Sequence, residues 1–407
     1  IVKYLKVRGS YGEVGNDQIG GDRFLYLPSS YGAASDSGVN KYNFGLASNP
    51  YTSLMIVENK IGNPDLTWEK AKKMIVGLDI NLFNNCLTAS FDIFKEKRNN
   101  ILANRSTSPM IIGANLPAYN FGEMENRGWE MDLNFRHHIQ DFHYWARFNY
   151  SFARNEIIYM DEVQKRYDYQ MTTGRRKNQF FGLIFDGYYN SWEEINALDR
   201  PKSSWSGNQL QPGDVKYIDV NQDGVIDDYD MVPIGYTPVP EIIYGFSFGA
   251  QYKGFDFSIL FQGADNVSIK YFGRSMWPFA KGEESAKSLI KERWTQERYE
   301  AGEKITFPRL SLNPNGETDH NYRPSTLWIR DASYLRLKNL EVGYTFTGGF
   351  VKRLNLNSVR LYFNGSNLFT WTDVVDLDPE APSRSGNVEI NTYPLQKVYN
   401  IGLNINF

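Results

Sequence analysis

The sequence has no long hydrophobic run and only one cysteine. No stretch reaches the roughly 18 uninterrupted apolar residues that a membrane-spanning helix needs, and the mean hydropathy is −0.50. The missing hydrophobic runs exclude a helical membrane protein. Cys86 has no second thiol to pair with, so the chain forms no internal disulfide.

An excess of charge of one sign is also missing. The 407 residues include 44 Lys and Arg against 47 Asp and Glu, which gives a net charge of −3. No segment concentrates Lys and Arg into the basic surface that a nucleic-acid-binding protein needs. We therefore expect no nucleic acid among the partners of this protein.

Aromatic residues, in contrast, are abundant and make up 15% of the chain. Many of them alternate with polar residues, as in Tyr399–Phe407, and this alternation indicates strands with two unlike faces. A polar mean hydropathy combined with many aromatic residues is typical of a transmembrane β-barrel. The pattern predicts ten strands, near residues 2–14, 71–83, 86–102, 127–138, 142–159, 242–253, 255–265, 331–346, 357–368 and 398–407.

The predicted connections alternate between long and short from one end of the chain to the other. Outer-membrane barrels have short periplasmic turns and long external loops. We therefore expect every long loop at the extracellular end and both ends of the chain at the periplasmic end. The long connections span about 15–70, 160–241, 266–330 and 369–397, the connection 103–126 is of medium length, and the short ones are 84–85, 139–141, 253–254 and 347–356.

Two segments depart from plain alternation. Within 331–346 the apolar residues change phase, which predicts a β-bulge at Lys338–Asn339. In Glu283–Arg298 apolar residues recur at helical spacing, which predicts a helix that supports a loop.

Six stretches of the chain have amino-acid sequences that are typical of one known family. Together, and in this order, they resemble the C-terminal portion of the SusC/RagA family of TonB-linked outer-membrane transporters of the Bacteroidetes. The resemblance covers essentially the whole chain. The stretches are LKVRGSYGEVGN (5–16), FFGLIFDGYY (180–189), GDVKYIDVNQDGVIDDYD (213–230), ASYLRLKNLEVGYTF (332–346), LYFNGSNLFTWTDVVDLDPE (361–380) and YPLQKVYNIGLNINF (393–407).

The resemblance implies an all-β fold, a transmembrane antiparallel up-and-down barrel of about 22 strands whose lumen holds a plug. Residues 1–407 would form a single, incomplete domain with about ten C-terminal strands, without the plug and the N-terminal strands. The start at Ile1–Tyr4 shows no initiating Met and no signal segment, so we expect it to be an interior point of a longer protein.

The resemblance also implies a function and its partners. We expect import of a glycan or oligopeptide across the outer membrane of a Gram-negative, Bacteroidetes-like cell. A SusD-like surface lipoprotein would help to capture this substrate. TonB–ExbB–ExbD would act through the absent N-terminal part, and outer-membrane lipid would surround the barrel. The residues that contact substrate stay unassigned.

Two other classes of function are alternatives: a barrel hydrolase and a passive porin or adhesin. Gly245–Gly249 matches the hydrolase pattern G-x-S-x-G, but it lies inside an alternating strand and not at a strand-to-helix turn. The four histidines include no H-E-x-x-H pattern, and we interpret them as solvated turn residues. We therefore expect no catalytic residue and no enzyme activity. The histidines are His137, His138, His143 and His320.

Residues 219–230 match the calcium loop D-x-[DN]-x-[DN]-G, in which Gly224 permits the sharp turn. Position twelve is an Asp instead of the usual Glu, and Lys216–Ile218 before the loop is extended instead of helical; a solvated acidic turn is the alternative. We expect a structural Ca²⁺ that fixes loop 160–241. The predicted ligands are Asp219, Asn221, Asp223, the carbonyl of Val225, Asp227 and Asp230.

Four tryptophans in the predicted loops have two competing interpretations. Their rings could stack on the apolar C–H faces of sugars, or they could pack the loops against one another or against the lipoprotein. The four are Trp192, Trp205, Trp277 and Trp371.

Overall fold

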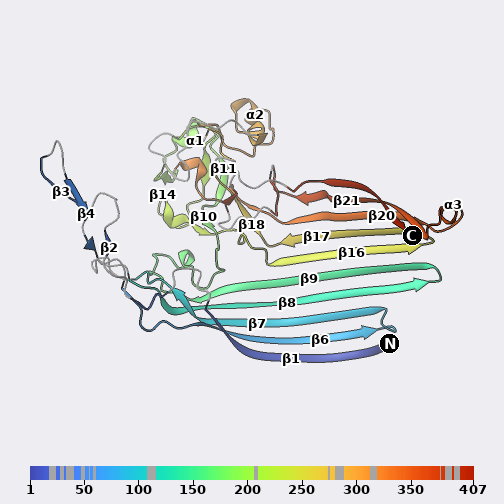
Figure 1. The fold of residues 1–407 in the computed structure, drawn as a ribbon. Helices are drawn as coiled ribbons and strands as arrows, with labels where there is room; N and C mark the ends of the chain where they lie inside the picture. Colours follow the sequence, from blue (N-terminus) through green and yellow to red (C-terminus); the bar gives the residue numbers. More distant parts are fainter. Residues whose placement is uncertain are drawn as a thin grey trace.

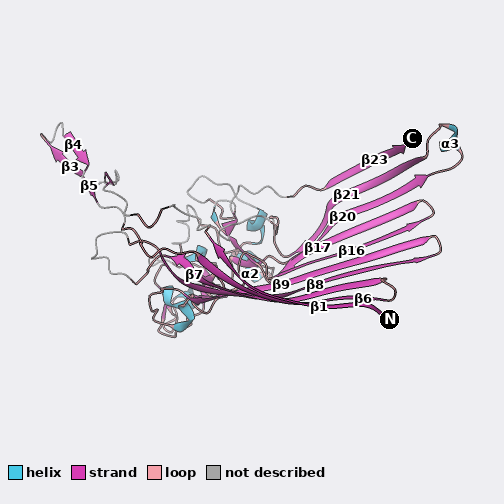
Figure 2. Ribbon diagram, turned by 60° about the horizontal axis from the view of Figure 1, so that its bottom comes forward, coloured by secondary structure: helices cyan, strands magenta, loops and turns pink. Residues whose placement is uncertain are grey.

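One ten-stranded antiparallel sheet dominates the computed structural model, and its strands follow one another in chain order (Figure 1). Figure 2 shows the same strands lying side by side in an open sheet, with β1 and β23 at its two edges. The structure describes residues 1–17, 24–27, 32–33, 41–46, 51–54, 56–57, 61–107, 116–205, 210–273, 276–279, 288–311, 319–375, 377–380, 387–388 and 395–407.

All ten predicted strands are confirmed. The largest difference is at the start of β8, which begins eight residues earlier than the alternation predicted, at Tyr119 instead of residue 127. The strands are β1 (Val2–Asn16), β6 (Glu69–Leu82), β7 (Leu87–Ala103), β8 (Tyr119–Ile139), β9 (Phe142–Tyr159), β16 (Ile242–Tyr252), β17 (Phe255–Asp265), β20 (Tyr334–Phe346), β21 (Ser358–Thr372) and β23 (Val398–Asn406).

Short turns join the strands at one end of the sheet, and both chain termini lie at this end (Figure 1). Two of the turns have only two residues, and the one that connects β16 to β17 consists of Lys253 and Gly254, which both have positive φ, 45° and 88°, as a two-residue hairpin turn requires. A Cβ at Gly254 would also lie 2.6 Å from the carbonyl oxygen of Thr345. The long connections leave from the opposite end, so the predicted separation of long and short connections is confirmed.

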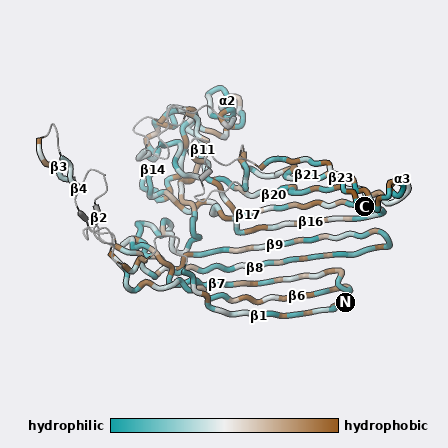
Figure 3. The backbone as a smooth tube through the Cα atoms, in the orientation of Figure 1, coloured by the Kyte–Doolittle hydropathy of each residue, from teal (hydrophilic) through white to brown (hydrophobic). Residues whose placement is uncertain are grey.

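The sheet has two unlike faces, and hydropathy alternates along its strands (Figure 3). We call them the apolar face, which carries side chains such as Met74, Trp129 and Phe248, and the polar face, which carries side chains such as Asp79 and Glu341. Large apolar residues stay exposed on the first face, which is what a lipid-contacting surface requires. Among the described residues, no helix combines the length and the hydropathy that crossing a membrane would take.

The predicted β-bulge in β20 is confirmed at Lys338. The register to both neighbours shifts between Leu337 and Asn339, which leaves Lys338 without a partner in the ladder. Its side chain reaches Glu380, with Nζ 3.2 Å from the carboxylate. The bulge therefore directs a lysine toward the segment that follows β21.

The prediction of a continuous helix over 283–298 is wrong in the described part. A 3-10 helix at Ser288–Glu292 and helix α2 (Gln296–Glu300) are separate. Between them the backbone N–H of Trp294 donates to the carbonyl of Phe307 at 2.8 Å, and this tertiary hydrogen bond outweighs the local helical pattern. Residues 283–287 lie outside the described residues.

The long connections contain short elements. The strands are β2 (Gly32–Ala33), β3 (Lys41–Phe44), β4 (Tyr51–Leu54), β5 (Ile56–Val57), β10 (Phe181–Gly182), β11 (Phe185–Tyr188), β12 (Lys202–Ser203), β13 (Val215–Tyr217), β14 (Val225–Ile226), β15 (Val232–Pro233), β18 (Ser268–Tyr271), β19 (Ile329–Asp331) and β22 (Asn387–Val388). The described helices of the long connections, besides α2 and Ser288–Glu292, are α1 (Trp192–Ile195) and 3-10 turns at Asp168–Gln170, Asp228–Asp230 and His320–Tyr322. Helix α3 (Phe350–Arg353) lies in the short connection between β20 and β21.

Candidate functional site

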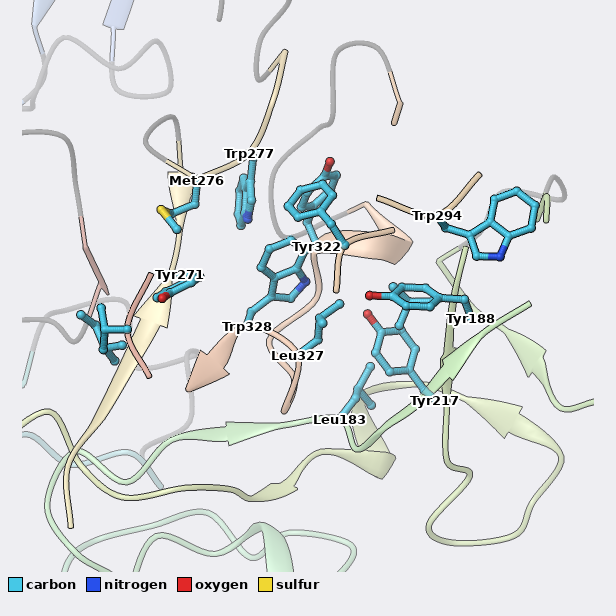
Figure 4. Close-up of a cluster of buried hydrophobic side chains, with 14 of the residues drawn as sticks. Leu183, Tyr188, Tyr217, Tyr271, Met276, Trp277, Trp294, Tyr322, Leu327 and Trp328 are labelled. Carbon is cyan, nitrogen blue, oxygen red and sulfur yellow. The ribbon is translucent and has the colours of Figure 1, made fainter. Parts of the chain in front are cut away.

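The long connections 160–241 and 266–330 fold together around a shared aromatic core at the loop end of the sheet (Figure 4). We call this cluster the loop core. Such burial fixes the mutual position of two loops that are far apart in the sequence. Its buried members are Leu183, Tyr188, Val215, Tyr217, Ile226, Val267, Ile269, Tyr271, Met276, Trp277, Trp294, Phe307, Tyr322, Leu327, Trp328, Ala332 and Val374.

A buried histidine joins the two loops. His320 Nε2 lies 2.7 Å from the carbonyl oxygen of Val215, so this nitrogen carries the proton and donates. Nδ1 is then the acceptor for the Ser203 hydroxyl at 2.8 Å. Burial lowers the pKa of His320, which keeps the ring neutral. The prediction that all four histidines are solvated turn residues is wrong for this one.

A buried polar group next to His320 continues this contact. The side-chain oxygen of Asn321 accepts the backbone N–H of Val215 at 2.9 Å, and its Nδ2 donates to Asp214 at 2.7 Å. Arg309 also donates to Asp214. Each of these polar groups has a partner from the other loop, which removes most of the cost of burying them.

The other three histidines, His137, His138 and His143, are exposed beside the turn between β8 and β9, as predicted. They line a cavity of about 370 Å³ together with Arg136, Tyr144, Trp145 and Arg147. In the part of the chain that the structure describes, no group of three or more His, Cys, Asp or Glu is arranged to hold a metal ion.

Two arginines cross-link neighbouring strands on the polar face. Arg8 of β1 donates to Asp79 of β6 at 3.1 Å and to Asp92 of β7 at 2.7 Å. Arg360 of β21 donates to Glu341 of β20 at 2.6 Å and also pairs with Asp256 of β17. Charged side chains on this face thus neutralise one another across three strands.

A glycine leaves room for each of these guanidinium groups. A Cβ at Gly343 would lie 2.7 Å from both Arg360 Nη2 and an Asp256 oxygen. A Cβ at Gly77 would lie 2.9 Å from the guanidinium carbon of Arg8. Any larger residue at either glycine would push into an ion pair.

A third arginine connects the ten-stranded sheet to the segment that follows β21. Arg336 is 2% exposed, donates to Asp378 at 2.7 Å and pairs with Glu380. Glu380 also accepts from the hydroxyl of Tyr334 at 2.6 Å and, as noted, from Lys338. The bulge therefore adds a second cation to an anchor between β20 and residues 377–380.

The predicted calcium loop forms a compact turn. Asp219 accepts the N–H groups of Gln222 and Gly224 at 2.7 and 2.8 Å, and Gly224 has φ +83°. Asp230 is fully buried, and its two oxygens accept backbone N–H groups of the loop, including Asp227 N at 2.9 Å. Burial raises the pKa of Asp230, whereas these hydrogen bonds lower it less strongly.

The tryptophans divide between packing and exposure. Trp277 is 3% exposed in the loop core, and Trp205 packs against that core with the guanidinium of Arg323 4.0 Å from its ring centroid. Trp371 is in β21 and not in a loop; it is 53% exposed beside Phe369 on the apolar face. Trp192 in α1 is 55% exposed, so it alone of the four keeps the geometry for stacking on a ligand from solution.

The serine of the G-x-S-x-G pattern lies within a regular strand. Ser247 sits in β16 opposite Arg147 and Leu260, and the ladder continues on both sides of it. No strand-to-helix turn exposes its hydroxyl, so the hydrolase elbow is not formed. In the Ser203–His320 pair the histidine is buried, the serine is half-buried, and both ring nitrogens of the histidine are occupied.

A ten-stranded meander with an exposed apolar face, short turns at one end and folded loops at the other defines an outer-membrane β-barrel. The chain belongs to the TonB-dependent receptor-like β-barrel family, whose model matches residues 1–368. Members of this family are receptors and transporters and not enzymes, and they reside in the outer membrane.

Within this family the relatives are of the SusC and RagA type. The chain is 28% identical over 99% of its length to TonB-dependent receptor P3 of Formosa agariphila and 26% identical over its full length to SusC of Bacteroides thetaiotaomicron. A solved RagAB peptide transporter structure has the same fold, with a TM-score of 0.70 over the whole chain and 24% identity. The chain spans 39%, 38% and 41% of these three, respectively.

Proposed function

We propose that this chain supplies barrel wall and extracellular loops to a TonB-dependent importer of a nutrient oligomer, which captures its substrate with a SusD-like surface lipoprotein. The loop core is the observation that carries the proposal. It builds a rigid body at the end of the barrel where substrate arrives, and such a body can support a second protein. A passive porin has no need for it.

In this proposal, strands outside residues 1–407 complete the barrel. β1 and β23 are edge strands of the described sheet, and unpaired backbone groups cost several kcal/mol each in hydrocarbon. Residues 1–407 therefore act as one incomplete domain whose edges pair with further strands. The plug and the contact with TonB–ExbB–ExbD belong to that remainder.

The substrate class is a glycan or an oligopeptide. The RagAB structures are of a peptide transporter, whereas an exposed aromatic ring such as that of Trp192 suits a sugar equally well. The two classes differ in the enzymes that must prepare the substrate. Glycoside hydrolases or peptidases encoded beside the transporter gene would indicate which one applies.

Growth and uptake assays test the import proposal. A strain lacking the transporter gene is compared with one lacking TonB and one lacking the SusD-like lipoprotein, on defined glycans and on peptides as the sole nutrient. We expect all three to lose uptake of the same oligomer and to keep uptake of its monomer. Oligomer uptake that persists without TonB would indicate a porin, and cleavage of the oligomer by the purified protein would indicate a hydrolase.

We also propose that loop 219–230 binds a structural Ca²⁺. Its ligand spacing supports this, as does the turn around Gly224 in which Asp219 and Asp223 already accept loop N–H groups. The side chains of Asp219, Asn221, Asp223 and Asp227 and the carbonyl of Val225 are the oxygens that would close around the ion, since the three carboxylates are not gathered into a metal-holding group in this structure. Asp230 holds the loop closed from its other side.

Thermal unfolding of the full-length transporter in calcium or EDTA tests this metal proposal. Calcium at about a hundred times its Kd should add about 2.7 kcal/mol to the stability of the loop. Asp219→Asn should abolish the gain. Asp228→Asn is the matched control, because Asp228 occupies no ligand position and its side chain is 75% exposed. An equal gain in magnesium, or none in wild type, would contradict the proposal.

A further inference from the structure

The apolar face ends in a row of cations on three adjacent strands. Going from the turns toward the loops, the apolar positions of β6, β7 and β8 end at Met74, Ile93 and Trp129. The next position on the same face is a cation in each strand. These three residues, which we call the interface row, are Lys72, Lys95 and Arg127.

The row is exposed and holds like charges close together. The side chains of Lys95 and Arg127 are 57% and 60% exposed, and these two residues are direct partners across the ladder. Lys72 is exposed and directly opposite Lys97. Like charges in facing positions destabilise a sheet, so the arrangement favours an anion between them.

Glu13 of β1 lies directly opposite Lys72 and pairs with Lys70 at 3.5 Å, whereas the two acids that pair with the row lie one position farther from the apolar face. Lys95 pairs with Glu125 at 2.9 Å and Arg127 with Glu156 at 3.7 Å. Arg127 and Glu156 are both well exposed, and an exposed pair contributes little to stability, so an anion can displace this acid. Glu125 is only 17% exposed and stays beside Lys95, whose ammonium has further N–H groups to donate. The cations can therefore turn toward the boundary of the apolar face while the acids stay on the loop side.

Cations at this boundary gather on one part of the sheet. β9 continues the row with Arg154, directly opposite Arg127, but its guanidinium is already paired with the buried Glu241. The equivalent residue is Glu13 on β1, Pro240 on β16, Asp265 on β17, Ser333 on β20, Asp373 on β21 and Lys397 on β23. Cations on four neighbouring strands, with Lys397 far from them along the sheet, indicate a local site.

We propose that the interface row binds the phosphate of a phosphorylated lipid in the outer leaflet. The boundary between the apolar face and the loop side is where lipid headgroups lie. Neighbouring strands are about 4.8 Å apart, so two adjacent cations can contact one phosphate, and long Lys and Arg side chains reach the interface while their stems cover apolar surface. The proposal depends on the membrane-spanning sheet and is independent of what the barrel imports.

Lipid binding to the full-length transporter in nanodiscs tests the proposal. The nanodiscs consist of phosphatidylcholine with a small fraction of phosphorylated lipid A or of the same lipid after phosphatase treatment, and bound lipid is quantified by native mass spectrometry. Wild type should prefer the phosphorylated form by about tenfold or more, since each interfacial cation contributes about 1 kcal/mol. The triple variant Lys72→Gln, Lys95→Gln, Arg127→Gln should lose this preference.

A matched variant removes three positive charges elsewhere. Lys3→Gln, Lys253→Gln and Lys304→Gln change exposed lysines outside the row and away from the loop-side boundary of the apolar face, and they should leave the preference unchanged. Heat-modifiable mobility on gels verifies that both variants are folded barrels.

Three outcomes would overturn the proposal. The first is that the control variant loses as much preference as the row variant, or that the row variant loses none. The second is that millimolar inorganic phosphate displaces the lipid completely, which would make the row a site for free phosphate. The third is that the row variant changes only the oligomeric state in sedimentation, which would make the row a protein interface.

Discussion

At the scale of single residues, the ion pair of Arg360 and Asp256 occupies the space that a side chain at Gly343 would need. Gly343→Ala places a methyl group 2.7 Å from Arg360 Nη2 and Asp256, which should destabilise the barrel by about 1–3 kcal/mol. Gly348→Ala is the control, since nothing lies within 4 Å of its Cβ position. Urea unfolding of the full-length protein in detergent measures both. Equal stability of the two variants would show that the Arg360 ion pair tolerates displacement.

His320 makes the loop core sensitive to acid. Its pKa is lowered by burial, whereas in the unfolded loop it returns to about 6.5. The unfolded state therefore binds more protons below this value, so stability is complete above about pH 6.5 and decreases as the pH falls. After correction for the intrinsic effect of pH, hydrogen exchange of the amides of Val215 and Trp328 should become faster as the pH falls from 7.5 to 5.5.

His320→Gln is the variant that isolates this effect, because a Gln amide can still donate to the Val215 carbonyl but does not titrate. Its exchange rates, corrected for the intrinsic effect of pH, should be nearly constant over the same range. If wild type and variant respond alike, another group carries the pH dependence.

At the scale of the strand, the two faces of the sheet should respond oppositely to the same substitution. Ile259 and Ser258 are neighbours in β17, but Ile259 lies on the apolar face and Ser258 pairs with Glu341 on the polar face. Ile259→Arg should cost about 2–4 kcal/mol in a bilayer. Ser258→Arg gains an acidic neighbour and should cost less than 1 kcal/mol. Refolding into lipid vesicles measures both, and equal costs would contradict the lipid-facing assignment.

Strands and turns were largely predictable, because alternation and turn residues are local signals. The phase change in 331–346 even located the bulge at Lys338. The early start of β8 was missed, since Tyr119–Asn126 carries Glu123 and Glu125 on the otherwise apolar face and so breaks the pattern. The prediction of a helix over 283–298 was wrong because a tertiary hydrogen bond of Trp294 interrupts the helical backbone.

At the scale of the whole molecule, the open sheet makes the chain dependent on further strands. β1 and β23 both expose unpaired edges, so residues 1–407 expressed alone should not give a heat-modifiable barrel. Co-expression with the rest of the transporter should restore it. A stable, monomeric barrel from residues 1–407 alone would mean that the ten strands close on themselves.

Local pattern in the sequence was enough to determine ten strands, their two faces and the end at which the long loops lie, because each depends on residues only a few positions apart. Only the tertiary structure decided what those loops do. His320 with Val215, Arg336 with Glu380 and the buried Trp277 come together over distances that no short pattern encodes. Burial of aromatic surface between distant segments, which depends on three-dimensional packing, converts two loops into one body.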